Sequence, residues 1–461
     1  MKMWYAGKWW RPVAIAAVLV LMICAMFKSY FIACGLLSCA DSTRPVSSNT
    51  QHSNAVLADL NGIEICLSIK FVDPIQRLEL TGSPQLGEDG PYSVVYNYLR
   101  PSRFYGVNET VTYTTHSTPE FMENVGAVAE RWDGPVSVAL YVPFTDFCRT
   151  IHRMIYLRNC DKAAYREKVA WHIFWLKESP PPTSWRLVPD ETHIDCDKLG
   201  TDYKHNEDLR NTWRTAQKLL YPVNVARNIA RKASTTWFVL PSDVELYPSL
   251  GLASQFMKYI KESSNEPVKQ LVTAIPGDVS PTLYSLILKV FVVPVFEVEK
   301  VLPDTKEELM IQYARNTAVY FHRMVCPHCQ RFPGLREWIN KPGIPGQIHA
   351  LSWSYRNVPY HRWEPIFVCS MQEPYYEERL SWEGLQDKMT QMHELCLRGY
   401  QFHLLDRAFL VHAVGIKKRK KGMPSYPSWR QLYIEQNDEL YDKVLWDLES
   451  KYGRNDLCQR H

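Results

Sequence analysis

Short apolar runs alternate with amphipathic stretches through the middle of the chain. Helical patterns occupy residues 208–220 and 250–262. The apolar runs resemble buried strands, and they are Val136 to Val142, Val169 to Leu176, Thr236 to Leu240 and Val290 to Phe296. Continuous apolar runs of roughly four to eight residues are typical of strands that are covered on both faces. The pattern therefore predicts an α/β domain in which helices flank a mixed, mostly parallel sheet.

The N-terminal end of the chain follows a different pattern. Three basic residues precede an uninterrupted apolar run over residues 13–27, and the chain stays mostly apolar to residue 40. A positive flank ahead of an apolar segment predicts a membrane anchor whose N-terminus stays in the cytosol. We therefore expect a cytoplasmic tail at 1–12, a signal-anchor transmembrane segment at 13–40 and a polar stem at 41–60, with a cleaved signal peptide as the alternative.

This topology would place the rest of the chain in an oxidising lumen. Nine of the 12 cysteines lie beyond the anchor, so several disulfides are expected, although their spacing does not reveal the pairing. The sequon Asn108-Glu109-Thr110 would be a glycosylation acceptor on that side. The pattern divides the lumenal chain into an N-terminal extension at 61–133, the main domain at 134–445 and a C-terminal tail at 446–461.

Composition narrows the class of protein. The chain has 461 residues, of which 46% are hydrophobic, so it can bury one large or two ordinary cores. Its formal charge of +4 at pH 7 is small for this length. A general nucleic-acid binder would carry a stronger basic balance, so no nucleic acid is expected among its partners.

Two carboxylates, Asp243 and Glu245, follow the predicted strand Thr236 to Leu240. In open α/β sheets, ligands bind outside the carboxyl ends of the strands. Residues two apart on an extended strand end point the same way, so both carboxylates can reach one divalent cation, which in turn can bridge to a diphosphate. The alternative is that Asp243 caps a helix and Glu245 is solvated.

Further motifs accompany this pair in a fixed order. The segment YPVNVARNIARKASTTWFVLPSDVELYPSLGL begins at Tyr221 and contains a Tyr-Pro-X-Asn-X-X-Arg-Asn stretch ahead of the strand and the acidic pair. The other motifs are the stretch from Val111, FVVPVFE from Phe291, CPHCQ from Cys326, RWEP from Arg362, YYEERL from Tyr375 and FHLLDRAFLVH from Phe402. Together they resemble glycosyltransferase family 49, whose acidic motif is Asp-X-Asp, so Glu245 stands where the family has Asp.

The resemblance implies a GT-A fold, a nucleotide-sugar donor and inversion at the anomeric carbon. It implies a Mn²⁺-dependent enzyme that transfers glucuronic acid from UDP-glucuronic acid to a glycan acceptor on a protein or a lipid. By the same resemblance we expect a type II Golgi membrane protein that acts in protein O-mannosylation and forms a complex with other Golgi transferases. The alternative is a non-catalytic member of the fold that binds glycans or partner proteins, because Glu245 departs from the family motif.

The resemblance also assigns three metal ligands. Asp243 and Glu245 are two of them, and His412, at the end of FHLLDRAFLVH, matches the family's late metal-ligand histidine. Two hard oxygen ligands and one imidazole suit Mn²⁺. Without the resemblance, His412 would be interpreted as a packed histidine at a strand end.

Three polar residues upstream of the strand are candidates for donor binding. Asn224, Arg227 and Asn228 are spaced i, i+3 and i+4, so they lie on one face of a predicted helix. Arg227 suits a sugar carboxylate or a phosphate through bidentate contact. The alternative is a polar helix surface.

Two carboxylates are candidates for the catalytic base that deprotonates the acceptor hydroxyl. Glu377 lies where relatives carry Asp, and Arg379 is positioned to orient it. Asp387 occupies a helix-start position at which many inverting GT-A enzymes keep a catalytic carboxylate, although family 49 members tend to have Asn there. Glu364 and Glu297 are expected to shape the acceptor side instead.

The CPHCQ stretch contains a Cys-X-X-Cys pair, Cys326 and Cys329. We interpret it as a structural disulfide, because the flanking sequence does not form the small βαβ unit of a thioredoxin-like protein. The alternatives are a zinc site with His322 or His328 and a lumenal thiol oxidoreductase.

Overall fold

The computed structural model describes residues 71–72, 85–181, 188–189, 194–205, 212–263, 288–419 and 426–460. Residues 55–461 form one compact unit. The expected tail, anchor and stem at 1–60 lie outside the described residues. In the part of the chain that is described, every helix is too short or too polar to cross a membrane.

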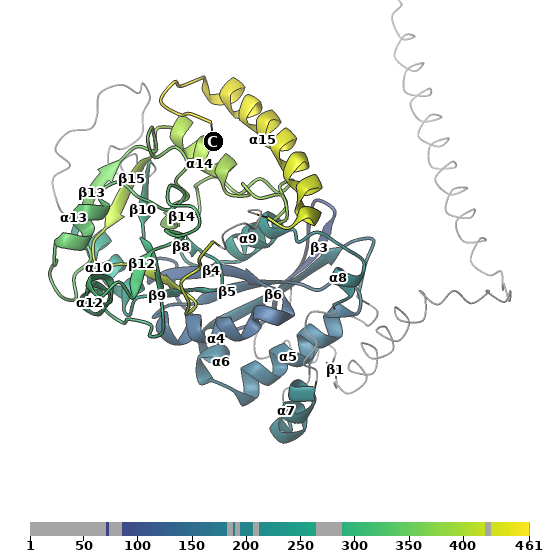
Figure 1. The fold of residues 1–461 in the computed structure, drawn as a ribbon. Coiled ribbons are helices and arrows are strands. Elements are labelled where there is room, and N and C mark those ends of the chain that lie inside the picture. The colour runs from purple at the N-terminus through teal and green to yellow at the C-terminus, as the bar shows by residue number, and fades with distance from the viewer. Residues whose placement is uncertain are drawn as a thin grey trace, which may run out of the picture. The chain divides into compact units, whose positions relative to one another are not determined.

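The centre of the unit is a ten-stranded sheet (Figure 1). Its order is β13 (Ala350–Ser354), β15 (Gln401–Leu405), β10 (Lys289–Val292), β14 (Phe367–Ser370), β8 (Phe238–Pro241), β4 (Val111–Ser117), β5 (Val136–Tyr141), β6 (Val169–Leu176), β3 (Tyr92–Leu99) and β2 (Gln85–Asp89). The sheet is mixed, as expected, but it is not mostly parallel. The strands β8, β4, β5 and β6 run parallel to one another, whereas β14 returns antiparallel between β8 and β10, and β3 and β2 form an antiparallel edge.

Two of the predicted strands appear almost unchanged, namely β5 and β6. Both faces of β5 are covered, because Val138 and Leu140 pack in one core and Ala139 and Tyr141 pack in another. This two-sided burial explains why the run is continuously apolar.

The predicted strand at 290–296 divides into two. β10 ends at Val292, and β11 (Val295–Val298) belongs to a second sheet of four strands. Val293 and Pro294 lie between them, and Pro294 cannot donate a backbone hydrogen bond, so it does not continue a sheet ladder. Apolar character alone did not reveal the break, because both halves are buried.

The four-stranded sheet has the order β12 (Ala318–Tyr320), β11, β16 (Leu410–His412) and β9 (Leu246–Pro248). β16 pairs parallel with β11 and antiparallel with β9. The chain also passes between the two sheets from β8 to β9, and residues 242–245 form this crossing. A separate two-stranded sheet joins β1 (Phe71–Val72) and β7 (Val188–Pro189).

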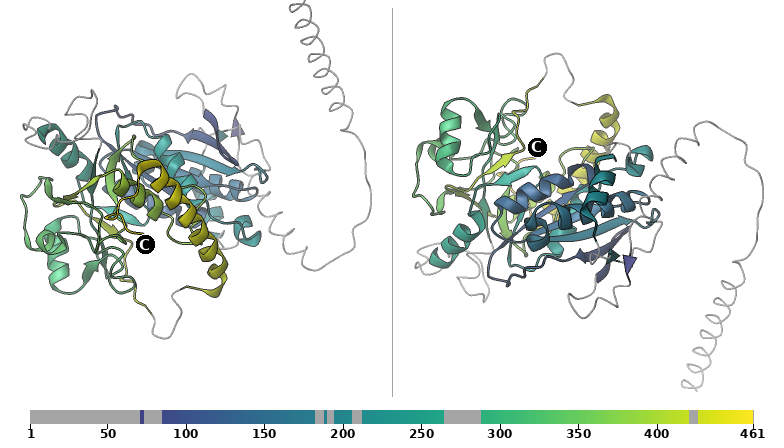
Figure 2. Two further views of the ribbon diagram at one scale, coloured as in Figure 1. Left: turned by 90° about the horizontal axis from the view of Figure 1, so that it is seen from above. Right: turned by 90° about the horizontal axis from the view of Figure 1, so that it is seen from below.

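Helices cover both faces of the parallel strands (Figure 1). The helices are α4 (Met122–Arg131), α5 (Asp146–Cys160), α6 (Ala163–Lys168), α7 (Cys196–His205), α8 (Trp213–Ala216), α9 (Val223–Lys232), α10 (Leu252–Ser263), α12 (Lys306–Ala314), α13 (Leu335–Asn340), α14 (Met389–Leu397) and α15 (Gln431–Tyr452), with 3-10 turns η2 (Pro119–Phe121) and η3 (Ser428–Arg430). α9 packs on β4 and β5, and α15 runs along α14 (Figure 2). The helix expected at 250–262 matches α10, whereas the described part of the one expected at 208–220 is helical only in α8.

The expected domain limits fall inside packed structure. The strands β2, β3 and β4 come from the segment expected as an extension, and they share the ten-stranded sheet with later strands. At the other end, α15 passes residue 445 without a break.

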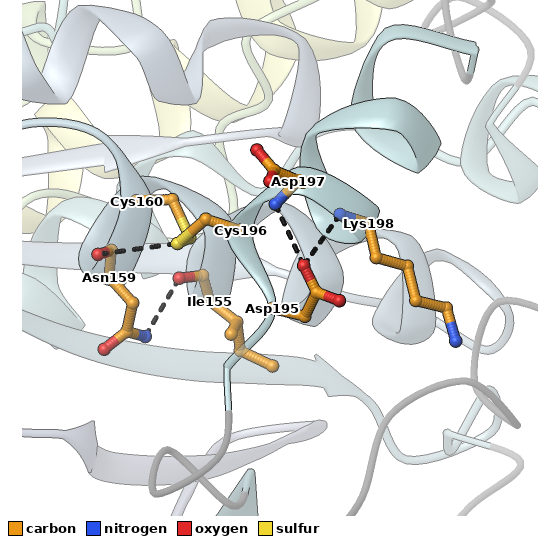
Figure 3. The surroundings of a disulfide bond; sticks show 7 residues. All are labelled: Ile155, Asn159, Cys160, Asp195, Cys196, Asp197 and Lys198. Carbon is orange, nitrogen blue, oxygen red and sulfur yellow. Dashed lines mark hydrogen bonds between the residues drawn. A yellow bond between two sulfur atoms is a disulfide. The ribbon is translucent and has the colours of Figure 1, made fainter.

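Disulfides link several segments of the described chain, as the cysteine content predicts. Cys160 at the end of α5 is bonded to Cys196 at the start of α7 (Figure 3). The carboxylate of Asp195 accepts hydrogen bonds from the backbone N–H groups of residues 197 and 198, which satisfies free donors of the first turn of α7. The other bridges with both members described are Cys326–Cys329 and Cys396–Cys458, and the one free described cysteine, Cys369, is buried.

Candidate active site

The carboxyl ends of the parallel strands β4 and β8 lie side by side. Thr114 of β4 pairs with Pro241 of β8, and the N–H of Ser242 donates to the carbonyl of Thr114 at 2.9 Å. The Tyr113 hydroxyl donates to the carbonyl of Leu246 at 2.7 Å, which holds the loop between β8 and β9. Asp243 therefore lies at the edge of the sheet where ligands of such folds bind.

The Asp243 carboxylate lies among basic side chains. Its oxygens accept hydrogen bonds from Arg227 Nη2 at 2.9 Å and Lys388 Nζ at 2.8 Å, and His116 Nε2 is 3.5 Å from Oδ1. Burial opposes the charge on Asp243, but Lys388 and Arg227 outweigh burial and hold the pKa of the carboxyl well below its ordinary value. The site is thus a partly buried cluster of fixed charges.

Arg227, on α9, connects two carboxylates. Besides Asp243, its guanidinium pairs with Asp387 through Nη1, which also donates to Asn224 Oδ1 at 2.9 Å. Burial favours the neutral form of Arg227, but Asp387 and Asp243 raise its pKa above the ordinary value. The guanidinium therefore stays charged although the residue is only 5% exposed.

Asn224 and Asn228 lie on the same face of α9 as Arg227, as predicted, and both are buried. The amide of Asn224 donates to the carbonyls of Glu377 and Asp387, each at 2.7 Å. Asn228 exchanges two hydrogen bonds with the backbone of Tyr376, at 2.9 and 3.0 Å. In this structure the two amides hold the segment 376–387 against α9 and orient it.

Both sequence-based candidates for the base lie on that segment. Glu377 accepts two hydrogen bonds from the Arg379 guanidinium, at 2.8 and 2.9 Å. Burial raises the pKa of Glu377, but the bonds from Arg379 more than compensate and lower it overall. The Asp387 carboxylate is paired with Arg227. Each candidate is therefore bound to an arginine.

Glu245 and His412 meet because β9 pairs with β16. His412 is opposite Leu246 in the ladder, and the N–H of Ala413 donates to the Glu245 carbonyl at 2.8 Å. This register brings His412 Nε2 to 3.6 Å from Glu245 Oε2. The neighbouring His412 ring lowers the pKa of the Glu245 carboxyl.

The pair of Glu245 and His412 fits a divalent cation. His412 Nδ1 lies 2.9 Å from the carbonyl oxygen of Ala413, so Nδ1 carries the proton and Nε2 directs its lone pair at the carboxylate. Two electron-rich atoms at this distance require a proton or a cation between them. Asp243 would supply a further oxygen of suitable chemistry, but in this structure its oxygens are paired with Arg227 and Lys388.

The sequence comparisons confirm the family resemblance. The model of a family described as "Glycosyl-transferase for dystroglycan" matches residues 110–453. The chain belongs to glycosyltransferase family 49. It is therefore an enzyme of the glycosyltransferase class.

Similar proteins include known members of this class. β-1,4-Glucuronyltransferase 1 of Bos taurus is 24% identical over 393 residues, which cover 84% of this chain and 86% of that protein. The Homo sapiens protein of the same name is 23% identical over 394 residues, with the same coverage. Xylosyl- and glucuronyltransferase LARGE1 of Mus musculus is 23% identical over 361 residues, which cover 75% of this chain and 36% of that longer protein.

Several residues of the glycosyltransferase site were not singled out from sequence. His116 reaches Asp243 from β4, and its Nδ1 lies 2.8 Å from the hydroxyl of Tyr221. Burial lowers the pKa of His116, so its ring is neutral. Lys388 directly follows Asp387. This pair of opposite charges ahead of α14 was the sequence signal that could have identified Lys388 as a site residue. His116 gave no local signal, because its role follows from the order of the strands.

The Cys-X-X-Cys pair of the glycosyltransferase is bridged, as we interpreted it. Among the described residues, Cys326, His328 and Cys329 are the only three potential ligands whose atoms all lie within 4.8 Å of one another. A disulfide leaves no thiolate to bind zinc, so a zinc site there would first require reduction. The loop contacts the site region through the carbonyl of Cys329, which accepts the N–H of Glu364 at 3.0 Å.

Proposed function

We propose that this glycosyltransferase transfers glucuronic acid from UDP-glucuronic acid to a hydroxyl of a glycan acceptor, with inversion and with Mn²⁺. Relatives named as glucuronyltransferases over most of the chain support the donor sugar. A GT-A fold is supported by the parallel strands β8, β4, β5 and β6 and by the crossing from β8 to a second sheet. A nucleotide-sugar donor and a glycan acceptor are the substrates of this class.

The observation that carries the proposal is the charge arrangement around Asp243. Arg227, which is buried, and Lys388, which is partly buried, supply two cations at the carboxyl end of β8, where a diphosphate or a sugar carboxylate would be neutralised. Asp243, Glu245 and His412 would hold Mn²⁺. The ion would stabilise the charge that develops on the departing diphosphate.

The residues of α9 have two proposed roles. Arg227 binds the donor by bidentate contact, because its guanidinium stays charged in a buried site. Asn224 and Asn228 assist donor binding by holding the segment 376–387 in place. Glu377 and Asp387 are the sequence-based candidates for the base that removes the acceptor proton.

The proposal includes a location. A type II membrane protein of the Golgi, anchored by residues 13–40, is supported by the basic flank before an apolar run and by the three disulfides that have both cysteines among the described residues. We place its acceptor on an O-mannosylated protein, with a glycolipid as the alternative. A complex with other Golgi transferases is part of the same proposal.

The test is UDP release by the full-length protein in detergent, measured across a panel of UDP-sugars and oligosaccharide acceptors with Mn²⁺. We expect release from UDP-glucuronic acid by the wild type and by Glu262→Ala, a control on the exposed end of α10. Asp243→Ala or a chelator should abolish it. Release that survives both would refute the metal site, and metal-dependent UDP binding without turnover of any donor would instead support a binding protein.

A further inference from the structure

Three carboxylates surround Lys388, and they differ in how they are paired. Asp243 is bonded to Lys388 and Arg227, and Asp387 is paired with Arg227. Glu364 interacts with Lys388 at longer range. Within the described residues its carboxylate has no hydrogen bond and no ion pair within 4.0 Å. Glu364 is therefore the carboxylate of this group whose lone pairs are available.

A general base needs such a lone pair. A carboxylate that is held by a guanidinium has its oxygens occupied, which is the situation of Glu377 and Asp387. We infer that Glu364, rather than either of these, is the general base that accepts the proton of the acceptor hydroxyl. This inference rests on the proposed transferase function.

The position of Glu364 follows from the strand register. β14 runs antiparallel to β8, with Cys369 opposite Val239 and Ser370 opposite Phe238. The start of β14 therefore lies beside the carboxyl end of β8. Glu364 precedes β14 by three residues and so lies beyond the end of β8, on the side of the sheet where Asp243 is found.

The backbone around Glu364 is well held. Its N–H donates to the carbonyl of Cys329 at 3.0 Å. The preceding residue, Trp363, is 3% exposed, and its carbonyl accepts Arg356 Nε at 2.8 Å. Packed neighbours and backbone bonds of this kind fix the backbone from which the Glu364 side chain extends.

The electrostatic surroundings suit a base. Burial raises the pKa of the Glu364 carboxyl to about 6, with Asp387 acting in the same direction and Lys388, Arg356 and Arg227 acting against it. A base is most effective when its pKa lies near the working pH, because it is then both deprotonated and sufficiently basic. The pKa of Glu377, by contrast, is lowered.

The transfer step breaks two bonds and forms two new ones. The acceptor O–H bond breaks, and its proton moves to the Glu364 carboxylate while the acceptor oxygen bonds to the anomeric carbon of the donor. The bond from that carbon to the phosphate oxygen breaks, and its electron pair leaves with UDP. Protonated Glu364 then releases its proton to water.

The test compares Glu364→Gln and Glu364→Asp with Glu377→Gln and Asp387→Asn in the full-length protein. We expect Glu364→Gln to lower kcat for transfer by about 10²-fold to 10⁴-fold, with Mn²⁺-dependent UDP binding retained. Glu364→Asp should recover part of that loss. The wild type, Glu377→Gln and Asp387→Asn should keep an acidic limb in kcat/KM that reports a group with a pKa of about 6, and Glu364→Gln should lack it.

The outcomes separate this inference from the proposed function. Wild-type transfer with near-normal turnover by Glu364→Gln would leave the transferase intact and refute Glu364 as the base. Disappearance of the acidic limb in Glu377→Gln or Asp387→Asn would move the role to that residue. Loss of UDP binding by Glu364→Gln would assign Glu364 to donor binding. If the wild type transfers no sugar from any donor, both the proposed function and the assignment of Glu364 as the base are refuted.

Discussion

Asp243 and Glu245 are two residues apart, yet they lie in different surroundings. Asp243 is bonded to Arg227 and Lys388, at 2.9 and 2.8 Å. Glu245 has His412 beside it, at 3.6 Å. Asp243 is thus held by permanent cations, whereas Glu245 lies beside an imidazole that can donate a lone pair to a metal.

The difference arises because the chain changes sheets between the two residues. β8 ends in the ten-stranded sheet, where α9 and the segment before α14 approach it, and β9 begins in the four-stranded sheet beside β16. The acidic motif therefore joins a region of paired charges, whose arginine and lysine are suited to phosphate, with a carboxylate-imidazole pair suited to Mn²⁺. Each half can be disrupted separately.

Among the variants that test this comparison, Arg227→Lys in the Asp243 half is expected to have the largest effect. Lysine keeps the charge but lacks the planar guanidinium, whose Nη2 and Nη1 bond Asp243 and Asp387 separately. We expect kcat/KM for the donor to fall by about 10²-fold, a loss of about 2.7 kcal/mol of transition-state stabilisation. Steady-state kinetics with UDP-glucuronic acid would measure it.

Arg231→Lys is the matched control, because Arg231 is buried on the same helix but bonds only the carbonyls of Pro374 and Glu373, at 2.8 and 3.0 Å, in the contacts described. It should lower Tm without changing the affinity for UDP. Equal losses of UDP affinity in both variants would show that Arg227 acts by holding the loop and not through its charge.

Sequence reasoning succeeded where a local pattern reflects one physical cause. The continuous apolar runs of β5 and β6 predicted strands covered on both faces, and the i, i+3, i+4 spacing of Asn224, Arg227 and Asn228 predicted a shared helical face. The acidic pair at a strand end predicted the edge of the sheet where the charged site lies. These features depend on residues close together in sequence.

The rest depends on tertiary structure. Lys388 and Glu364 reach the end of β8 from loops more than a hundred residues later, and no local period encodes that approach. The break at Pro294 was hidden, because both sheets bury the strands on either side of it. The pairing state of each carboxylate, which separates Glu364 from Glu377 and Asp387, is likewise set by long-range neighbours.

A smaller effect is expected in the Glu245 half, from His412→Gln. This change removes the imidazole opposite Glu245 while the cations near Asp243 remain. We expect the apparent affinity for Mn²⁺ to fall by at least about 10-fold, with saturating metal restoring most of the turnover. Activity titrated against Mn²⁺ would measure the shift, and Glu262→Ala, the exposed control on α10, should leave the Mn²⁺ midpoint unchanged. Equal midpoints for His412→Gln and the wild type would remove His412 from the metal site.

The smallest effect concerns pH and the histidine of the Asp243 half. Burial and the nearby cations Arg227 and Lys388 lower the pKa of His116, and Asp243 only partly opposes them. The folded pKa is thus below the unfolded value of about 6.5. The stabilisation from neutral His116 is fully present above that value and is lost as the pH falls below it, because the unfolded chain then binds a proton that the folded chain does not.

We expect the free energy of unfolding to decrease less steeply between pH 7 and 5 in His116→Gln than in the wild type. Chemical denaturation at several pH values, with chelator present, would measure both slopes. Other buried histidines contribute equally to both proteins, so identical slopes would mean that the pKa of His116 is the same in the folded and the unfolded chain.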